Sequence, residues 1–338
     1  MMSETMPAVL VRDGGSRGAW NELALGRAPR PEVRAGGVLV QVEACSVNRA
    51  DLLQRRGLYP PPPGASPILG LDFAGFLVSV SPDVQRWHVG DRVFGIVPGG
   101  GYARYLTIPA DQLLPIPPNL SFVEAAAAAE VFIAAYVSLF VEGELIPAES
   151  VLIHGGGSGV GTAAIQLVLA RGAIPLVTAG TDEKVGRCLE LGARLAVNHR
   201  SRDFEDGVRR FTGGAGVDVV LDWIGAPYLQ KHLRLLREKG RLVVIGLMGG
   251  GKAEIPLDLV VTRRLRVIGS VLRSRSDGER AGIIQAFEAE VLPWLRDGIV
   301  KPVVHRIFSM AEVAQAHEIL RESSHFGKVV LVWDTVRD

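Results

Sequence analysis

Cysteine is scarce in this sequence, and its scarcity excludes several classes of protein. Only Cys45 and Cys188 occur among 338 residues. Two cysteines are too few for a disulfide framework or for a zinc lobe with four cysteine ligands. This usage is consistent with a reducing compartment, so we expect a cytoplasmic protein.

An excess of charge of either sign is also absent. Lys and Arg number 37 against 36 Asp and Glu, which gives a net charge of +1. No global field therefore favours nucleic acid or an anionic membrane, and we expect neither as a partner. We interpret the densest local basic groups as solvated surface charges. They are Arg263, Arg264 and Arg266, and the pair Arg273 and Arg275.

Long hydrophobic runs are missing as well. The first twenty residues lack the apolar core of a signal peptide. The longest apolar segment, residues 125–141, contains Glu130 and is mostly alanine, so it falls short of a membrane span. We interpret it as a buried helix that links two domains.

The most informative stretch that is present covers residues 150–180. An apolar run at 151–153 is broken by the glycines of 155–161, and apolar residues then recur at helical spacing until Gly172. A second apolar run follows at 174–177. This pattern predicts a βαβ unit with parallel strands and a right-handed crossover.

The glycines of this unit predict a dinucleotide site, because a turn that admits a diphosphate cannot carry β-carbons and the next helix offers free N–H groups. The usual G-x-G-x-x-G fingerprint is not satisfied. The closer template is A-x-x-G-x-x-G, with Gly155, Ser158 and Gly161 at its fixed positions. Ser158 could bind a cofactor phosphate or a substrate oxygen, could be an ordinary helix N-cap, or could do both.

The order of the patterns predicts an α/β protein of two domains. Short β-like runs separated by turn residues fill 1–127. A helix follows, with Ser121 as N-cap and Glu124 as capping-box partner. Strands then alternate with helices, as in a doubly wound nucleotide-binding domain. The expected strands are 151–154, 174–179, 195–198, 217–222, 241–246 and 265–271.

The last part of the chain is expected to rejoin the first domain. A helix is predicted over 280–296, and strands over 302–308 and 328–333 flank a helix at 310–322. The predicted domains are therefore 1–127 with 275–338, and 128–274.

Several stretches carry a resemblance that runs nearly end to end. They are SVNRADLLQRRGLYPPPPGASPILGLDFAG (46–75), PGGGYARYLTIP (98–109), SGVGTAAIQL (158–167), GLMGGG (246–251), VLRSR (271–275) and AEVAQAHEILRESSHFGKVVL (311–331). The chain resembles the zinc-free quinone oxidoreductase branch of the medium-chain dehydrogenase/reductase superfamily. The resemblance implies a GroES-like, mainly β catalytic domain and a Rossmann domain that binds NADPH, with the active site in the cleft between them.

Zinc can be examined by position. Zinc-dependent alcohol dehydrogenases of this superfamily have a cysteine ligand and a histidine ligand where this chain has Asn48 and Leu71. Leucine has no lone pair to donate, and Asp72 alone cannot supply three ligands. The seven histidines show no ligand spacing. We predict no catalytic metal.

The resemblance also implies roles for single residues. Asn48 would lie near the nicotinamide ribose, and Tyr59 would line the quinone pocket with its hydroxyl toward a substrate oxygen; with Ser158 they are the candidate catalytic residues. Pro60 to Pro63 restrict the Tyr59 loop. The alternatives are that Tyr59 is an exposed loop aromatic or that Pro60 to Pro63 form a polyproline ligand for another protein.

In the helix that enters the nucleotide domain, the family commonly has a threonine that can bind the nicotinamide carboxamide. This chain has Ala134 at that position. The candidate cofactor-binding residues are Asn48, Val131, Ser158, Gly159, Val160, Gly180, Lys184, Asn198, His199, Ile224, Gly246, Leu247, Met248, Ser270, Leu272, Arg273 and Lys328.

Cofactor choice is predicted from the end of the second Rossmann strand, where NAD-specific domains place a carboxylate. Here the strand ends at Ala179 and Gly180 without one, and Asp182 is expected to cap the next helix. Lys184, one turn into that helix, occupies the place where the family binds the 2′-phosphate. We expect NADPH rather than NADH, although Lys184 and Arg200 could also be solvated surface charges.

The expected function is therefore NADPH-dependent quinone reduction by hydride transfer without zinc. One alternative is an NADPH-dependent reductase of α,β-unsaturated carbonyls such as alkenals or enoyl thioesters. Another is an NADPH-binding protein with a structural, regulatory or RNA-associated role. We also expect a homodimer that pairs the apolar strand 265–271 with its symmetry mate and brings Arg266 near the two-fold axis.

Overall fold

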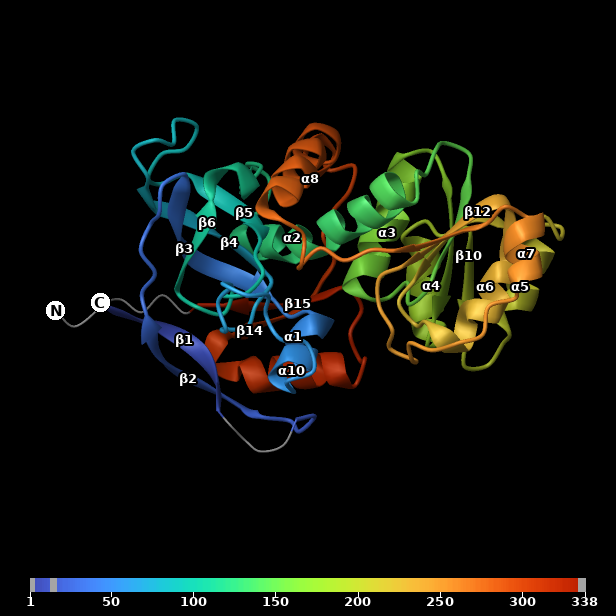
Figure 1. Cartoon of the computed structure of the whole chain (residues 1–338), viewed down its shortest axis with the longest axis horizontal. Helices are drawn as coiled ribbons and strands as arrows, with labels where there is room; N and C mark the ends of the chain where they lie inside the picture. The colour runs from blue at the N-terminus through green and yellow to red at the C-terminus, as the bar shows by residue number, and fades with distance from the viewer. Residues whose placement is uncertain (1–3, 13–16, 334–338) are drawn as a thin grey trace. The chain divides into compact units, whose positions relative to one another are not determined.

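The computed structural model describes residues 4–12 and 17–333, which fall into two compact units (Figure 1). Unit 1 combines the chain up to Glu130 with Arg273–Gly298 and the chain from Pro302 onward. Unit 2 comprises Val131–Leu272 and Ile299–Lys301. The last of these segments belongs to unit 2 because both backbone groups of Lys301 bond to the Gln166 side chain, at 2.8 and 2.9 Å.

Unit 1 is built around a seven-stranded sheet in the order β14-β15-β3-β4-β5-β7, with β6 also paired to β3. A separate antiparallel pair is formed by β1 and β2. The last strand, β15, pairs with β3 at Val330 and Ser46, so the end of the chain rejoins the first sheet as predicted. The strands are β1 Thr5–Arg12, β2 Glu22–Pro29, β3 Gly37–Ser46, β4 Asp72–Val80, β5 Arg92–Ile96, β6 Tyr105–Pro109, β7 Leu114–Pro115, β14 Val304–Ser309 and β15 Lys328–Val332.

Helices α1, η1, η4 and α10 contribute side chains to an apolar core that includes the fully buried Phe73 and Tyr102, and α8 and α9 complete the helices of unit 1. They are α1 Arg49–Arg55, η1 Ala110–Gln112, α8 Asp277–Glu290, α9 Leu292–Arg296, η4 Met310–Glu312 and α10 Val313–Arg321. The segment 280–296 is helical as predicted, but it forms two helices instead of one. Ser276 and Glu279 form a capping box that starts α8 earlier, and the chain begins a new helix at Leu292, where Pro293 lacks the N–H that a continuing helix needs.

Unit 2 is a parallel six-stranded sheet in the order β10-β9-β8-β11-β12-β13. Helices α3 and α4 cover one face and α5, α6 and α7 the other (Figure 1). The strands are β8 Ser150–Ile153, β9 Ile174–Ala179, β10 Leu195–Asn198, β11 Val217–Asp222, β12 Leu236–Val244 and β13 Arg266–Gly269. The helices are η2 Val137–Glu142, α3 Gly159–Ala170, α4 Asp182–Glu190, α5 Phe204–Phe211, η3 Ala226–Tyr228, α6 Leu229–Leu235 and α7 Leu257–Thr262, and α2 Phe122–Tyr136 crosses the boundary between the units.

The α/β class and the doubly wound sheet are therefore confirmed. Strand order reverses between β8 and β11, and ligands of such sheets bind beyond the carboxyl ends of the strands at this point. Strand β12 starts at Leu236, five residues before the predicted start at 241. The prediction missed this segment because it contains Lys239 with a φ of 61° beside Gly240, a turn-like sequence inside a strand.

Two of three predicted helix caps are confirmed. Ser121 and Glu124 form the capping box before α2, with Ser121 N–H 2.9 Å from Glu124 Oε2. Ser158 caps α3 by accepting from Gly161 N–H at 3.0 Å. The prediction that Asp182 caps α4 is wrong. Thr181 is still extended and its side chain accepts from Lys184 N–H, so Asp182 is already in the helix.

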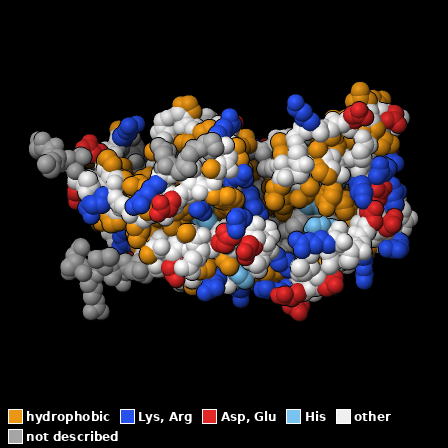
Figure 2. All heavy atoms as spheres, turned by 90° about the horizontal axis from the view of Figure 1, so that it is seen from below, with side chains coloured by type: hydrophobic (Ala, Val, Ile, Leu, Met, Phe, Trp, Pro, Cys, Tyr) orange, Lys and Arg blue, Asp and Glu red, His pale blue; other side chains and the backbone are white. Residues whose placement is uncertain are grey.

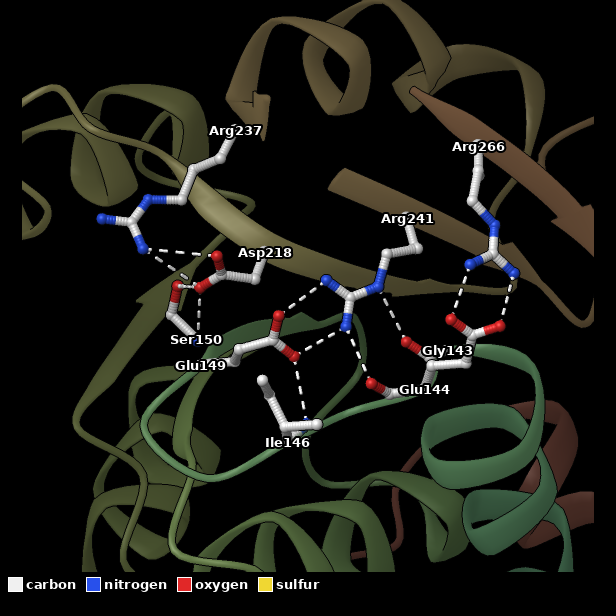
Figure 3. Close-up of polar contacts among 9 residues, drawn as sticks. All are labelled: Gly143, Glu144, Ile146, Glu149, Ser150, Asp218, Arg237, Arg241 and Arg266. Carbon is white, nitrogen blue, oxygen red and sulfur yellow. Dashed lines mark hydrogen bonds and ion pairs between the residues drawn. The ribbon is translucent and has the colours of Figure 1, made fainter. Parts of the chain in front are cut away.

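Two arginines, Arg241 and Arg266, link strands of the unit 2 sheet to the segment that precedes β8 (Figure 3). Arg241 on β12 contacts both carboxylate oxygens of Glu149 at 2.8 and 2.6 Å and donates to the carbonyls of Gly143 and Glu144. These contacts satisfy backbone acceptors that follow η2, because a helix end leaves carbonyls without partners. On β13, Arg266 pairs with the Glu144 carboxylate at 2.8 Å.

One helical segment, residues 122–142, is long and apolar enough to cross a membrane by length and composition alone. In the structure 78% of its most apolar window is buried, as in the core helix that we predicted. On the face shown in Figure 2, basic and acidic side chains are interspersed. That surface agrees with the balanced charge of the sequence.

Candidate functional site

The glycine turn after β8 is packed so tightly that side chains are excluded. A β-carbon at Gly156 would lie 2.9 Å from Cys188 Sγ and 3.0 Å from Val177 Cβ. Gly155 has a φ of 56°, and a β-carbon there would lie 3.1 Å from the Trp223 ring. The turn therefore holds its backbone close to the amino terminus of α3, the geometry that suits a phosphate group.

Ser158 retains hydrogen-bonding capacity after it caps α3. Its hydroxyl oxygen accepts from Gly161 N–H. Among the residues that the structure describes, no acceptor for the hydroxyl proton is found. The side chain can therefore serve as the cap and donate to a ligand at the same time. The next two candidates, Gly159 and Val160, form the first turn of α3.

A basic rim surrounds Gly180 at the end of β9. A β-carbon at Gly180 would lie 3.5 Å from Arg200 Nε and 3.6 Å from His199 Nε2. Burial, and then the nearby Arg200 charge, lowers the pKa of Lys184. The pKa of His199 is lowered by the same two causes. An anion bound beside Arg200 would stabilise the charged forms of Lys184 and His199.

Asn198 fixes the geometry of this rim. Its amide donates to Asp182 Oδ1 at 2.9 Å and its carbonyl oxygen accepts from Arg200 N–H at 3.1 Å. The Asp182 carboxylate, in the first turn of α4, thus accepts from Asn198. This arrangement leaves Gly180 faced by basic side chains.

A second pair of loops lies beyond the carboxyl ends of β11 and β12. Asp222 accepts from Ile224 N–H at 2.8 Å and from Gly225 N–H at 2.9 Å. Met248 N–H donates to the Trp223 carbonyl at 3.0 Å, which joins the two loops. The candidates Ile224, Gly246, Leu247 and Met248 therefore share one loop cluster. Leu247 and Met248 are exposed.

The remaining unit 2 candidates occupy other environments. Val131 is buried in α2 with Ala134, so the helix face around them is apolar. Ser270 donates its N–H to the Val244 carbonyl at 3.0 Å, one residue beyond β13. Leu272 is half-buried at the end of the unit.

Sequence reasoning missed a buried polar chain beneath the glycine turn. Gly155 N–H donates to Thr178 Oγ1 at 3.3 Å, and that hydroxyl lies 3.0 Å from His154 Nδ1. The two imidazoles meet, His154 Nε2 to His232 Nε2, at 2.8 Å. Asp222 Oδ2 lies 3.9 Å from His232 Nδ1. The sequence signal was weak, because these residues come from the loop after β8, from β9, from β11 and from α6.

In unit 1, Asn48 is the centre of a buried polar network. Its amide nitrogen donates to Asp72 Oδ2 at 2.7 Å, and its amide oxygen accepts from Lys328 Nζ at 2.6 Å. Ser46 donates both its N–H and its hydroxyl to Asp72. The orientation of the Asn48 side chain is therefore set from both ends.

Lys328 is the cation of this network and is 4% exposed. It lies 3.8 Å from Asp72 Oδ2 and donates to the Val47 carbonyl at 3.1 Å. Burial raises the pKa of both Asp72 and Glu130, and the Lys328 charge opposes this in each case. The sequence placed Lys328 among cofactor ligands, but it gave no sign of the contact with Asn48.

Tyr59 is half-buried, and its hydroxyl has no hydrogen-bond partner among the described residues. Burial raises the pKa of this hydroxyl, and Arg273 opposes the effect. The Arg273 guanidinium lies 4.9 Å from the centre of the Tyr59 ring. A fixed aromatic ring with an unpaired hydroxyl is suited to contact an acceptor oxygen.

Family models match both halves of the chain. The Alcohol dehydrogenase GroES-like domain matches residues 34–118, and the Zinc-binding dehydrogenase model matches residues 159–288. The quinone oxidoreductase of Rattus norvegicus is 33% identical over 307 residues, which cover 89% of this chain and 91% of that protein. This decides the family. The chain belongs to the quinone oxidoreductase branch of the medium-chain dehydrogenase/reductase superfamily.

Solved structures agree with this membership. CurK enoyl reductase is 28% identical with a TM-score of 0.85, covering 97% of this chain and 99% of that one. An NAD-dependent alcohol dehydrogenase is 31% identical with a TM-score of 0.83, covering 97% and 100%. The predicted GroES-like and Rossmann architecture is thus confirmed. The chain is an oxidoreductase, and its family implies a nicotinamide cofactor.

Proposed function

We propose that this oxidoreductase reduces quinones with NADPH and without zinc. The observation that carries the proposal is the Lys328 ammonium, 2.6 Å from the Asn48 amide oxygen and 3.8 Å from Asp72. A zinc ion placed among these side chains would meet a buried positive charge and a nitrogen that is already donating. Acceptors that take a hydride without Lewis-acid help suit such a site.

The side chains that could ligate a metal ion support the same proposal. Within the described residues, the one group of three His, Cys, Asp or Glu side chains close enough to share a metal ion is His154, Asp222 and His232. That group lies in unit 2 and includes neither Asn48 nor Leu71. Amide and leucine side chains are poor substitutes for the histidine and cysteine ligands of catalytic zinc.

NADPH is proposed from the basic rim around Gly180. The turn at Gly155 to Gly161 would hold the diphosphate through backbone N–H groups, with Ser158 as an added donor. Lys184, His199 and Arg200 would hold the 2′-phosphate, since His199 and Arg200 face Gly180 and the Arg200 charge is near enough to Lys184 to lower its pKa. When bound, the reduced nicotinamide supplies a hydride.

Tyr59 is proposed to serve the acceptor. Its unpaired hydroxyl would donate to the quinone oxygen that gains negative charge. Asn48, which Asp72 and Lys328 hold in place, would lie near the nicotinamide ribose. A quinone can take the hydride before a proton arrives, so solvent would supply the proton and Tyr59 need not be an acid.

A second candidate is reduction of α,β-unsaturated carbonyls. The similarity to CurK enoyl reductase, 28% identical with a TM-score of 0.85, favours it specifically. An enone also gains negative charge on an oxygen when it accepts hydride, so Tyr59 could serve either acceptor.

The experiment is an acceptor screen followed through NADPH absorbance. Para-quinones, ortho-quinones, alkenals and enoyl thioesters are compared by kcat/KM, with NADH in parallel. We expect the highest values for quinones with NADPH. Higher values for alkenals or enoyl thioesters would favour reduction of α,β-unsaturated carbonyls instead. No turnover with any acceptor would overturn both proposed functions.

A further inference from the structure

Arg273 is a buried cation at the start of the last segment of unit 1, with 8% of the residue exposed. Its Nε donates to the Pro98 carbonyl at 2.8 Å and its Nη1 to the Tyr59 carbonyl at 3.1 Å. Its Nη2 donates to Gln54 Oε1. All three acceptors are neutral, and among the described residues no carboxylate forms an ion pair with Arg273.

A buried guanidinium without a carboxylate is costly, because desolvation of a charge is repaid fully only by an opposite charge. Burial accordingly lowers the pKa of Arg273, and Tyr59 and Asp51 oppose this effect without forming an ion pair with the guanidinium. The Tyr59 ring, 4.9 Å from the guanidinium carbon, offsets part of this cost through its π-face. A neutral hydrogen-bond donor could bind the same carbonyl oxygens. The positive charge of Arg273 is therefore not explained by these hydrogen bonds alone.

The positive charge faces Tyr59. Two charged groups influence the Tyr59 hydroxyl beyond burial: Arg273, which lowers its pKa, and Glu130, which raises it. A cation close to a phenol makes the hydroxyl a stronger hydrogen-bond donor. The same cation stabilises negative charge on whatever oxygen accepts that bond, and the effect is large where water is excluded.

We propose that Arg273 is a positioning residue that fixes the Tyr59 loop and supplies the positive charge that stabilises the acceptor oxygen at the Tyr59 hydroxyl. This inference rests on the proposed function. In the reduction a hydride with its electron pair passes from a reduced nicotinamide to the acceptor, and the negative charge that appears on the acceptor oxygen is later neutralised by a proton from water. Arg273 acts in the interval before that proton arrives.

Two consequences separate this role from mere support of the loop. The rate should depend on the charge of residue 273 and not only on its hydrogen bonds. The dependence should also pass through the Tyr59 hydroxyl, so that removing this hydroxyl removes most of the sensitivity to residue 273. Gln54 offers a matched control, because Gln54→Leu removes one contact of the guanidinium and leaves the charge in place.

The first test is a double-mutant cycle in quinone reduction. We expect Arg273→Met to lower kcat by about 10-fold to 100-fold, below the range for a direct oxyanion donor. Arg273→Lys should recover most of the loss, and Gln54→Leu should have a much smaller effect. In a Tyr59→Phe background, Arg273→Met should change kcat by about two-fold or less.

The second test needs no turnover. With ¹³C-labelled tyrosine, the Tyr59 signal is assigned by its loss in Tyr59→Phe and titrated in the protein without substrate. We expect Arg273→Met to raise the pKa of the Tyr59 hydroxyl and Arg273→Lys to leave it close to the original value. Near-ultraviolet circular dichroism spectra and thermal unfolding curves that match those of the parent would show that the variants are folded.

The outcomes are distinguishable. Quinone turnover by the parent protein with equal loss in Arg273→Lys and Arg273→Met, or an unchanged Tyr59 titration, overturns the inference and leaves the proposed function intact. Equal losses in Gln54→Leu and Arg273→Met reduce Arg273 to a structural clamp and overturn it as well. Absence of turnover in the parent overturns both.

Discussion

At the scale of single residues, cofactor selectivity is proposed to depend on Lys184. Burial and the Arg200 charge lower its pKa and Glu183 opposes them, so an anion bound beside Lys184 and Arg200 would stabilise both positive charges. We expect Lys184→Ala to raise KM for NADPH far more than KM for NADH. The loss of binding free energy for NADPH should be about 1–3 kcal/mol, the range for a hydrogen bond to a charged group.

Steady-state kinetics with both cofactors measure this effect. Lys301→Ala is a suitable control, since Lys301 is exposed and its structural contacts use only its backbone. Equal changes in KM for the two cofactors would refute the 2′-phosphate assignment.

A second residue-scale prediction concerns His232. Burial lowers its pKa from 6.5 to about 3, so the unfolded chain binds a proton there at a pH where the folded chain does not. The stability that this histidine contributes is present above pH 6.5 and is lost as the pH falls toward 3. Between pH 7 and pH 5 the loss from this group should be about 2 kcal/mol.

His232→Asn keeps a polar group opposite His154 and removes the titration. Urea unfolding at pH 7 and pH 5 should show a smaller decrease in stability for the variant than for the parent. Asp222, whose pKa is raised to about 6, contributes with the opposite sign in both proteins. An identical decrease in both would contradict the role given to His232.

At the scale of elements, Arg241 joins strand β12 to the segment that precedes β8 (Figure 3). The guanidinium and Glu149 are both largely buried. Removing one partner leaves the other buried and unpaired, so Arg241→Met should lower the free energy of unfolding by about 3 kcal/mol.

Arg237 gives the matched control, because it contacts Asp218 at 3.3 Å with a side chain that is 45% exposed. Arg237→Met should cost less than about 1 kcal/mol. Urea midpoints of the two variants test the contrast, and similar midpoints would argue against the buried ion pair as an anchor of the sheet.

The elements that the sequence predicted best were those with local signals. The βαβ unit after Ser150 follows from apolar period and glycines, and the Ser121 and Ser158 caps follow from side chains that bond within one turn. The cap of α4 was misassigned because Thr181 and Asp182 are both good N-caps, and only the backbone angle at the strand end decides between them.

Contacts made by residues far apart in the sequence could not be predicted in the same way. The Lys328 to Asn48 hydrogen bond spans 280 positions and depends on β15 joining β3. The contact of Arg273 with the Tyr59 carbonyl spans 214 positions. Residue type alone gave these side chains candidate roles, but the partners that orient them are set by sheet topology.

At the scale of the whole molecule, we propose a homodimer formed through β13. This strand lies at the edge of the unit 2 sheet, with Val267 45% exposed. Arg266 on the same strand already pairs with Glu144, so its charge would enter such an interface with a partner (Figure 3). Unpaired edge strands with exposed apolar side chains tend to pair with another chain.

Light scattering after size exclusion should therefore give twice the mass of the chain at micromolar concentration. Val267→Lys should shift the protein to the monomer. Ile307→Lys is the control, because Ile307 is 50% exposed on β14, the edge strand of the unit 1 sheet. A monomeric parent protein, or dissociation by the Ile307 variant alone, would argue against β13.

The central claim is zinc-free reduction of quinones with NADPH, and one measurement tests it most directly. The protein is exhaustively chelated, its metal content is determined, and kcat/KM for a para-quinone is measured with NADPH and with NADH. We expect full activity at negligible metal content and a clear preference for NADPH, because Lys328 lies beside Asn48 and basic side chains face Gly180. Activity that disappears with the metal and returns with zinc, or equal values for the two cofactors, would contradict the account.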